Sequence, residues 1–259
     1  MEPPINQENK KISDQKTFVV TGGTRGIGRA VSLDLARAGH RVFSLYVRNK
    51  EAAESVSGLA EKENLEIYTV KGDLSKKEGI STVCDELFAK CDHIDGLVHC
   101  AASGVHRKVD ELTPKHLRWT MEINVFAFYE LYFALKKRFK DGARMVALTS
   151  SGGTRALPFY TSVGTSKGAL ESLVRHMAVE LSPSLTVNLV CPGLVETDAV
   201  TAFPERETRV SGAKEGTPSG RLTSPVDVAR LVHFLMLEPS ASQIVGQTLT
   251  MDGGKCIKA

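Results

Sequence analysis

Short apolar runs rich in β-branched residues alternate with helical patterns along nearly the whole sequence. The first run, residues 16–21, leads into residues 26–38, where apolar side chains recur at the spacing of one helix face. The alternation continues with predicted strands at residues 41–47, 66–71, 95–99, 144–149, 186–191 and 248–251, and predicted helices at residues 50–63, 76–90, 114–137, 161–181 and 225–237. Strands and helices that alternate through short connections form right-handed βαβ units around a parallel sheet, which predicts a doubly wound α/β fold.

The length of 259 residues is compatible with one domain or two, and the alternation decides between them. No internal repeat, low-complexity tract or Pro/Gly-rich linker divides the chain, so we predict one domain over residues 16–259. Apolar residues at 42% and charged residues at 24% are typical of a chain with a packed core and exclude global disorder. Residues 1–15 are polar and are interpreted as a flexible N-terminal arm.

Charge and cysteine content exclude several classes of function. The 33 basic and 30 acidic residues leave a net charge of +3 without a block of Lys or Arg, which argues against a nucleic-acid partner. The five cysteines form no CxxC pair and no histidines stand at ligand spacing, so we expect reduced thiols, no metal site and a cytoplasmic protein. No apolar run approaches the roughly 18 residues of a membrane span, and we expect no membrane partner and no signal peptide.

The turn after the first predicted strand has the glycine spacing of a phosphate-binding loop. Residues 21–28 read TGGTRGIG, which follows the pattern TGxxxGxG between a strand and a helix. Glycines let the backbone approach a pyrophosphate closely, and the N-terminus of the following helix offers unpaired N–H groups. Because the loop joins a strand to a helix, we interpret it as a dinucleotide site rather than as an ordinary glycine-rich turn. The predicted contacts are Gly22, Thr24, Arg25, Gly26, Ile27 and Gly28.

The end of the second predicted strand indicates which dinucleotide is bound. NAD sites usually place an Asp or Glu there, but residues 46–50 read YVRNK. Arg25 and Arg48 could flank a 2′-phosphate through charge-assisted hydrogen bonds, which favours NADPH; the alternative is two solvated surface arginines. After the third predicted strand, Asp73 and Leu74 are candidates for contact with the adenine, although Asp73 could also cap the next helix.

Further motif residues stand at Asn124, Ser150, Lys167 and residues 192–197, which read PGLVET. Together with the glycine pattern and Asp73, they resemble the short-chain dehydrogenase/reductase family over essentially the whole chain from residue 16. The resemblance implies a Rossmann-like fold with a seven-stranded parallel sheet, and a homotetramer or homodimer. It also implies cofactor contacts, with Thr197 reaching the nicotinamide carboxamide. These contacts are Cys100, Ala101, Pro192, Gly193, Val195 and Thr197.

The catalytic spacing departs from the common form of that family. Most members carry a Tyr four residues before the Lys, where this chain has Val163, which cannot donate a proton. The nearest Tyr is Tyr160, seven residues before Lys167. On a helix that step returns within about 20° of the same face and advances about 10.5 Å along the axis, so both side chains can address one cleft.

The displaced Tyr is similar to that of the enoyl-acyl-carrier-protein reductases. Residues 95–105 (DGLVHCAASGV), 154–160 (TRALPFY) and 178–183 (AVELSP) also resemble NADPH-dependent members of that group. In reduction of a conjugated enoyl thioester, hydride goes to the β-carbon and negative charge develops on a carbonyl oxygen three bonds away. The donor that stabilises this oxygen must therefore stand elsewhere than in ketone reduction. Ser150 is a departure, because many enoyl reductases carry a second Tyr at that place.

The resemblance implies roles for four catalytic candidates. Tyr160 would stabilise the enolate oxygen and relay a proton, and Lys167 would hydrogen-bond the nicotinamide ribose and favour the phenolate. Asn124 would hold a water in a proton path, and Ser150 would orient substrate or cofactor. The alternatives are a packing aromatic for Tyr160 and a solvated helix lysine for Lys167. The histidines show no triad or metal pattern, and we expect them in core or surface positions.

Residues 199–217 lack a clean period and are interpreted as a lid over the substrate, with Phe203 as an apolar lining. An acyl carrier protein is acidic, so the lid cations could dock it, although solvated loop charges explain them equally well. These cations are Arg206, Arg209 and Lys214.

We therefore predict NADPH-dependent reduction of the double bond of a 2-enoyl thioester, carried by acyl carrier protein, in fatty-acid or polyketide-type biosynthesis. Two alternatives stay open. The first is a 3-oxoacyl or ketone reductase of the short-chain family, against which Val163 argues. The second is a catalytically silent dinucleotide-binding protein, against which the pair of Tyr160 and Lys167 argues.

Overall fold

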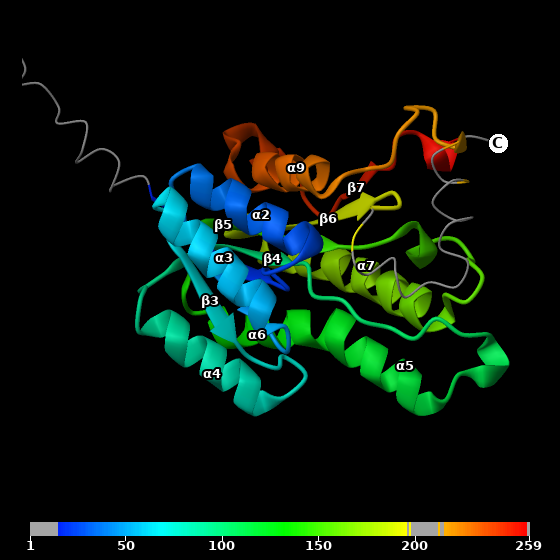
Figure 1. Cartoon of the computed structure of the whole chain (residues 1–259), viewed down its shortest axis with the longest axis horizontal. Helices are drawn as coiled ribbons and strands as arrows, with labels where there is room; N and C mark the ends of the chain where they lie inside the picture. The colour runs from blue at the N-terminus through cyan, green and yellow to red at the C-terminus, as the bar shows by residue number, and fades with distance from the viewer. Residues whose placement is uncertain (1–14, 196, 198–211, 213–214, 258–259) are drawn as a thin grey trace, which may run out of the picture.

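A seven-stranded parallel sheet with helices on both faces forms the centre of the molecule (Figure 1). The computed structural model describes residues 15–195, 197, 212 and 215–257. The strands are β1 (Thr17–Thr21), β2 (Arg41–Tyr46), β3 (Ile67–Lys71), β4 (Ile94–His99), β5 (Phe139–Leu148), β6 (Leu185–Pro192) and β7 (Thr248–Met251). Their order in the sheet is β3-β2-β1-β4-β5-β6-β7, and all neighbours are parallel. The predicted doubly wound, Rossmann-like fold is confirmed.

The strand order reverses at β1, which has β2 on one side and β4 on the other. Thr21, the last residue of β1, lies beside Leu45 of β2 and His99 of β4. The connections that leave β1 and β4 go to opposite faces, which opens a crevice at the carboxyl ends of these strands. The turn after β1 and the loop after β4 therefore border the same crevice.

Two apolar cores, one on each face of the sheet, hold the helices in place. The helices are α2 (Gly26–Arg37), α3 (Lys50–Glu63), α4 (Lys77–Phe88), α5 (Pro114–Met121), α6 (Ala127–Leu135), α7 (Thr161–Leu181) and α9 (Pro225–Leu237). One core joins α2 and α9 to the sheet, and the other joins α4, α6 and α7. Successive residues of β1 alternate between them: Phe18 and Val20 belong to the first core and Val19 to the second. Such strands are buried on both faces, which explains their continuous apolar runs.

The helix predicted over residues 114–137 is not continuous. A π-helical turn, Glu122–Phe126, separates α5 from α6. The side chain of Asn124, in the middle of this turn, is fully buried and bonds to other segments of the chain. The sequence pattern indicated one helix because a single π-turn adds only one residue to the repeat. Such turns occur frequently at functional sites.

Local signals predicted several element boundaries correctly. The helices at residues 50–63, 161–181 and 225–237 and the strand at residues 248–251 are as expected. Ser224 caps α9 through a hydrogen bond from the Asp227 backbone N–H (3.2 Å), and a Pro follows at the first helical position. In contrast, β5 begins at Phe139 rather than at residue 144, because its first four residues are partly or fully exposed and carry no apolar run.

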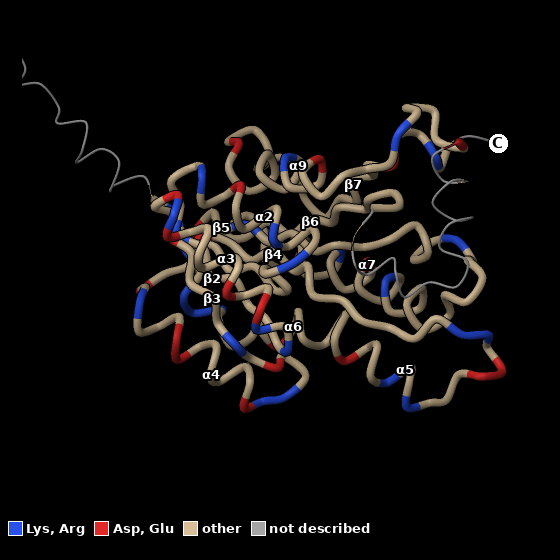
Figure 2. Tube along the Cα trace, viewed as in Figure 1, with Lys and Arg blue, Asp and Glu red and all other residues tan. Residues whose placement is uncertain are grey.

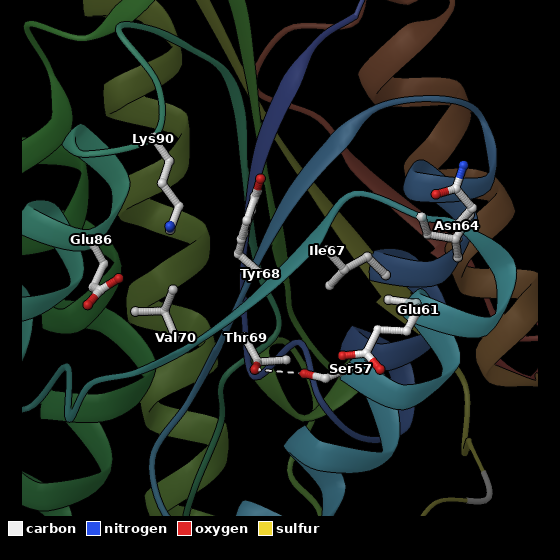
Figure 3. A pocket seen from close by; sticks show the side chains of 11 residues that line it. Ser57, Glu61, Asn64, Ile67, Tyr68, Thr69, Val70, Glu86 and Lys90 are labelled. Atoms are coloured by element: carbon white, nitrogen blue, oxygen red, sulfur yellow. Dashed lines mark hydrogen bonds between the residues drawn. The ribbon is translucent and has the colours of Figure 1, made fainter.

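A hollow away from the crevice lies beside the edge strand β3, between α3 and α4, where Ser57 and Thr69 are joined by a 3.1 Å hydrogen bond (Figure 3). Its lining contains none of the residues predicted for cofactor binding or catalysis.

Figure 2 shows basic and acidic residues interspersed along the described chain. Among the described helices, none is long and apolar enough to cross a membrane.

Candidate active site

The turn between β1 and α2 leaves no room for side chains at two of its glycines. A Cβ at Gly28 would lie 2.1 Å from the carbonyl oxygen of Gly22. Gly22 has a φ of +64°, a conformation that other residues rarely adopt, and a Cβ there would lie 3.1 Å from the backbone nitrogen of Ala101. The backbone of the turn therefore carries no side chain at these two positions and lies close to the loop after β4. A pyrophosphate could approach such a backbone closely.

The N-terminus of α2 is open toward the same crevice. Arg25 is the N-cap residue of this helix, and its side chain makes no capping hydrogen bond. The first N–H groups of a helix lack intrahelical partners, and with the positive end of the helix dipole they favour an anion. Thr24 is buried and Ile27 is half-buried, so the turn is anchored in the fold. These residues fit the phosphates of a dinucleotide.

The residues predicted for the adenosine end follow three neighbouring strands: Arg25 comes after β1, Arg48 after β2, and Asp73 and Leu74 after β3. Arg25 and Arg48 are both exposed. Hydrogen bonds from Ser75 lower the pKa of Asp73, and the nearby charges of Lys76 and then Arg48 act in the same direction. The carboxylate of Asp73 accepts these bonds from the Ser75 hydroxyl (2.7 Å) and backbone N–H (3.1 Å). The alternative that Asp73 caps the next helix is wrong, because Lys76 is the N-cap residue of α4. Leu74 is buried in the core.

A buried histidine ties the loop after β4 to the end of β1. The Thr21 hydroxyl accepts a hydrogen bond from the backbone N–H of Ala101 (2.9 Å) and lies 3.0 Å from Nδ1 of His99. His99 is fully buried, and burial, reinforced by the charge of Lys167, lowers its pKa to about 3. The imidazole is therefore neutral at physiological pH, and its role here is to hold the loop that contains Cys100 and Ala101.

The described residues of the segment after β6 reach the phosphate-binding turn. Pro192 ends β6, and the N–H of Gly193 donates to the carbonyl of Met251 (2.8 Å). Val195 is buried and forms an isolated bridge with Thr223. The methyl group of Thr197 would lie 3.4 Å from a Cβ placed on Gly26. The structure thus brings Thr197 to the phosphate-binding turn, although the two lie far apart in sequence.

Tyr160 lies one residue before α7, as its N-cap residue. The prediction from helical geometry treated Tyr160 as part of the helix and is therefore corrected. Its hydroxyl donates to Oγ of Ser150 (3.2 Å), which follows β5. Burial raises the pKa of the Tyr160 phenol, and the hydrogen bond with Ser150 opposes this shift. Tyr160 and Ser150 therefore form a hydroxyl pair at the carboxyl end of the sheet.

Lys167 lies in the second turn of α7 and is almost completely buried, with 4% of its surface exposed. Its Nζ donates to the carbonyl of Leu148 at the end of β5 (2.7 Å). Burial lowers the pKa of Lys167 to about 8, while Cys100 and Glu171 act in the opposite direction. The interpretation of Lys167 as a solvated helix lysine is therefore wrong. A buried cation beside the end of β5 can bind a polar group of a ligand and stabilise negative charge nearby.

The position that most family members give to Tyr is closed in this chain. Val163 is 6% exposed and packs directly against the loop after β4. A Cβ on Gly104 would lie only 2.1 Å from Cγ2 of Val163. A larger side chain at position 163 would crowd this loop, and the role of Tyr160 as the acid of the site stays a prediction.

Asn124 links three segments beneath the site. Its Oδ1 accepts from the N–H of Ser103 (2.8 Å), and its Nδ2 donates to the carbonyl of Ser103 (2.9 Å) and to Oγ of Ser166 (2.9 Å). Both amide hydrogens are thus bonded to the protein, which ties the loop after β4 to α7 through the π-helical turn. The proposed role of Asn124 in a proton path stays a prediction.

Sequence reasoning missed two residues that contact Tyr160. The imidazole of His106 stacks on the Tyr160 ring, with centroids 5.5 Å apart and planes inclined by 27°. A Cβ on Gly152 would lie 2.4 Å from both Cδ1 and Cε1 of the same ring. The Gly152-Gly153 pair after Ser150 was a visible signal of close packing, whereas nothing in the sequence around His106 points to Tyr160.

The predicted lid lies almost entirely outside the described residues. Phe203 and the three proposed docking cations, Arg206, Arg209 and Lys214, are all outside them. Within the described ranges, no group of three or more His, Cys, Asp or Glu side chains could hold a metal ion. The five cysteines, all of them described, are free thiols.

Comparisons with known proteins agree with this geometry. A family model described as Enoyl-(Acyl carrier protein) reductase matches residues 22–255. A 1-cyclohexenylcarbonyl-CoA reductase of Streptomyces collinus is 34% identical over 248 residues, which cover 95% of this chain and 88% of that relative. A 7α-hydroxysteroid dehydrogenase structure, complexed with NADH and 7-oxo glycochenodeoxycholic acid, is 29% identical with a TM-score of 0.87 and covers 97% of this chain and 98% of its own. The angucycline C-6 ketoreductase LanV with bound NADP is 29% identical with a TM-score of 0.86 and covers 93% and 96%.

Proposed function

The chain belongs to the short-chain dehydrogenase/reductase family of oxidoreductases, and from this premise we propose that it reduces the carbon–carbon double bond of a 2-enoyl thioester with NADPH. One observation carries the proposal: the acid of the site, Tyr160, stands outside α7, while the position within α7 that most family members use is closed by Val163 against Gly104. The family model is described as an enoyl-carrier-protein reductase, and one relative is named as the reductase of an unsaturated acyl-CoA.

The displaced phenol suits the charge distribution of this reaction. The nicotinamide, when bound, supplies the hydride that forms a new C–H bond at the β-carbon. The electron pair of the double bond then moves toward the thioester carbonyl, so that negative charge develops on its oxygen. In the structure the Tyr160 hydroxyl donates its one proton to Ser150; with substrate bound, it donates to that oxygen instead and accepts from the Ser150 hydroxyl, which orients it. A proton taken up at the α-carbon completes the reduction.

Lys167 provides the positive charge of the site. Its burial beside the end of β5 lets it bind the nicotinamide ribose and stabilise a phenolate of Tyr160 more strongly than an exposed cation would. The preference for NADPH rests on Arg25 and Arg48, which are exposed near the adenosine end, together with the absence of an acidic residue from the sequence YVRNK at the end of β2.

Turnover measurements on two thioesters test the proposal. NADPH oxidation is followed with crotonyl and with acetoacetyl thioesters, each on coenzyme A and on acyl carrier protein, and repeated with NADH. We expect oxidation with the crotonyl thioesters and a preference for NADPH. Turnover of the acetoacetyl thioesters alone would assign the chain to the ketone reductases instead. Tight NADPH binding without turnover of either thioester would assign it to the silent dinucleotide-binding proteins.

A pair of variants tests the role of Tyr160. Tyr160→Phe removes the donor, and loss of such a donor to a developing oxyanion lowers kcat by roughly 100- to 1,000-fold. Tyr68→Phe is the matched control, because its hydroxyl bonds to Glu66 at the edge of the sheet (3.3 Å), away from the crevice. Equal kcat values for the two variants would exclude Tyr160 as the acid.

The partners of the protein are also part of the proposal. An aromatic stripe is exposed on α5, the π-helical turn and α6. It is formed by Trp119, Phe126, Tyr129 and Phe133, which are 38%, 47%, 43% and 55% exposed. Exposed apolar patches of this kind mark interaction surfaces, so we propose that a second copy of the chain covers it in a homodimer or homotetramer. Sedimentation of Phe133→Glu against the wild-type chain tests this, because a charge in the stripe would favour the monomer. An unchanged oligomer would show that the stripe is not the interface.

A further inference from the structure

The helix that follows Tyr160 holds its backbone but not its ring, since the Tyr160 carbonyl accepts from the N–H of Gly164 (2.6 Å). Tyr160 is the N-cap residue of α7, and its side chain makes no capping bond. The preceding residue, Phe159, has a φ of +62°, a left-handed conformation that is costly for a residue with a side chain. The backbone therefore turns sharply just before Tyr160, and the orientation of its ring must be set by contacts from elsewhere in the fold.

The loop after β4 supplies such a contact through His106. The half-buried imidazole of His106 stacks on the Tyr160 ring, with centroids 5.5 Å apart and planes inclined by 27°. Stacked aromatic pairs prefer centroid separations of about 4.5–7 Å, so this is a favourable contact rather than a chance approach.

The backbone beside His106 is bonded to the start of α7. The hydroxyl of Ser162 donates to the carbonyl of Val105 (2.9 Å) and accepts from the N–H of Val105 (3.4 Å). Gly104 packs against Val163 so closely that a Cβ would meet it at 2.1 Å. The residue before His106 is thus held to the second residue of α7, which keeps the backbone of His106 beside Tyr160.

We propose that His106 is the positioning residue of Tyr160: its imidazole stacks on the phenol ring and directs the hydroxyl toward Ser150 and the reacting oxygen. The ring is then limited by His106 at its face and by Gly152 along its Cδ1–Cε1 side, while the hydroxyl bonds to Ser150. This inference rests on the proposed role of Tyr160 as the acid and holds whether the substrate is an enoyl or an oxoacyl thioester.

Three variants separate positioning from other roles. His106→Ala removes the ring, His106→Phe keeps a flat ring without the nitrogens, and His93→Ala is a control at an exposed site before β4. Because a displacement of about 1 Å can lower a rate by roughly 100-fold, we expect His106→Ala to lower kcat by roughly 10- to 100-fold. The KM for the thioester and the Kd for NADPH should stay near the wild-type values, and His106→Phe should recover most of the lost kcat.

Three kinetic outcomes overturn the proposal. A wild-type kcat for His106→Ala shows that the stacking is dispensable. Equal losses for His106→Ala and His106→Phe show that the imidazole nitrogens, not the stacked ring, are required. A fall in kcat accompanied by parallel losses of NADPH affinity and thermal stability shows a general structural role.

A spectroscopic measurement keeps the inference testable if neither thioester is turned over. The phenolate absorption is measured against pH for the chain with Tyr160 and for the Tyr160→Phe variant. The difference between the two curves reports the ionisation of Tyr160. Burial raises the pKa of this phenol, so removal of the covering ring in His106→Ala should admit water and lower that pKa toward the ordinary value. His106→Phe should leave the titration nearly unchanged. An identical titration for wild type and His106→Ala would overturn the proposal independently of the substrate.

Discussion

Replacement of Gly152 by Ala should disable the site by moving the Tyr160 ring. The new Cβ would lie 2.4 Å from Cδ1 and Cε1 of the ring, whereas ordinary contacts begin at 3.4 Å, so the ring must retreat by about 1 Å. The hydrogen bond between Tyr160 and Ser150 is already long at 3.2 Å, and such a displacement would break it. A misplacement of about 1 Å can cost roughly 100-fold in rate, which corresponds to about 2.7 kcal/mol in the activation free energy.

The assay for Gly152→Ala compares kcat, KM and NADPH affinity with those of a second Gly-to-Ala variant. Gly58 lies exposed on α3, and a Cβ added there would have no atom within 4 Å, so Gly58→Ala should keep full activity and gain about 1 kcal/mol of helix stability. We expect Gly152→Ala to bind NADPH normally and to lose kcat. If its kcat equals that of Gly58→Ala, the close packing of Gly152 against Tyr160 does not control catalysis and the reasoning is refuted.

Three other residues allow predictions of their own. The value of kcat/KM for NADPH reports the ionisation of groups in the free enzyme. It should fall as the pH rises through about 8, because Lys167 then loses its proton and its charge. A flat pH profile across this range would contradict a role for the Lys167 cation. Val163→Tyr restores the common family spacing but overpacks the contact with Gly104, so we expect a loss of about 1–3 kcal/mol in thermal unfolding and no gain of ketone reduction with the acetoacetyl thioester. Arg48→Ala should weaken NADPH binding by roughly 10-fold and leave NADH binding unchanged, whereas Lys50→Ala, on an exposed side chain that pairs with Glu54, should change neither.

Much of the fold could be predicted because the decisive signals are local. The helix over residues 225–237 was correct to the residue, since Ser224 and the following Pro mark its start within a few positions of the chain. The cofactor turn could be predicted for the same reason: Gly22 and Gly28 lie close together although they are only six positions apart in the sequence. The long helix predicted over residues 114–137 failed where the signal is not local, because Asn124 bonds to Ser103 and Ser166 on other elements.

The positions of Tyr160 and Lys167 depend on contacts between segments that lie far apart in the sequence. The sequence predicted that Tyr160 and Lys167 belong to one site, but not that Tyr160 stands outside α7 or that Lys167 is buried. It contained no indication that His106 stacks on Tyr160, since no spacing rule relates two loops.

The sequence by itself thus determined the α/β architecture, and it predicted the dinucleotide turn and Tyr160 as the acid, because periodicity, capping and motif spacing act over a few residues. Only the tertiary structure decided where that acid points. Thr21 and His99 illustrate the difference: they meet at 3.0 Å across 78 residues of sequence. Such long-range contacts depend on the packing of whole helices and strands in the sheet. That packing, rather than the residues of a loop, sets the path of the loop.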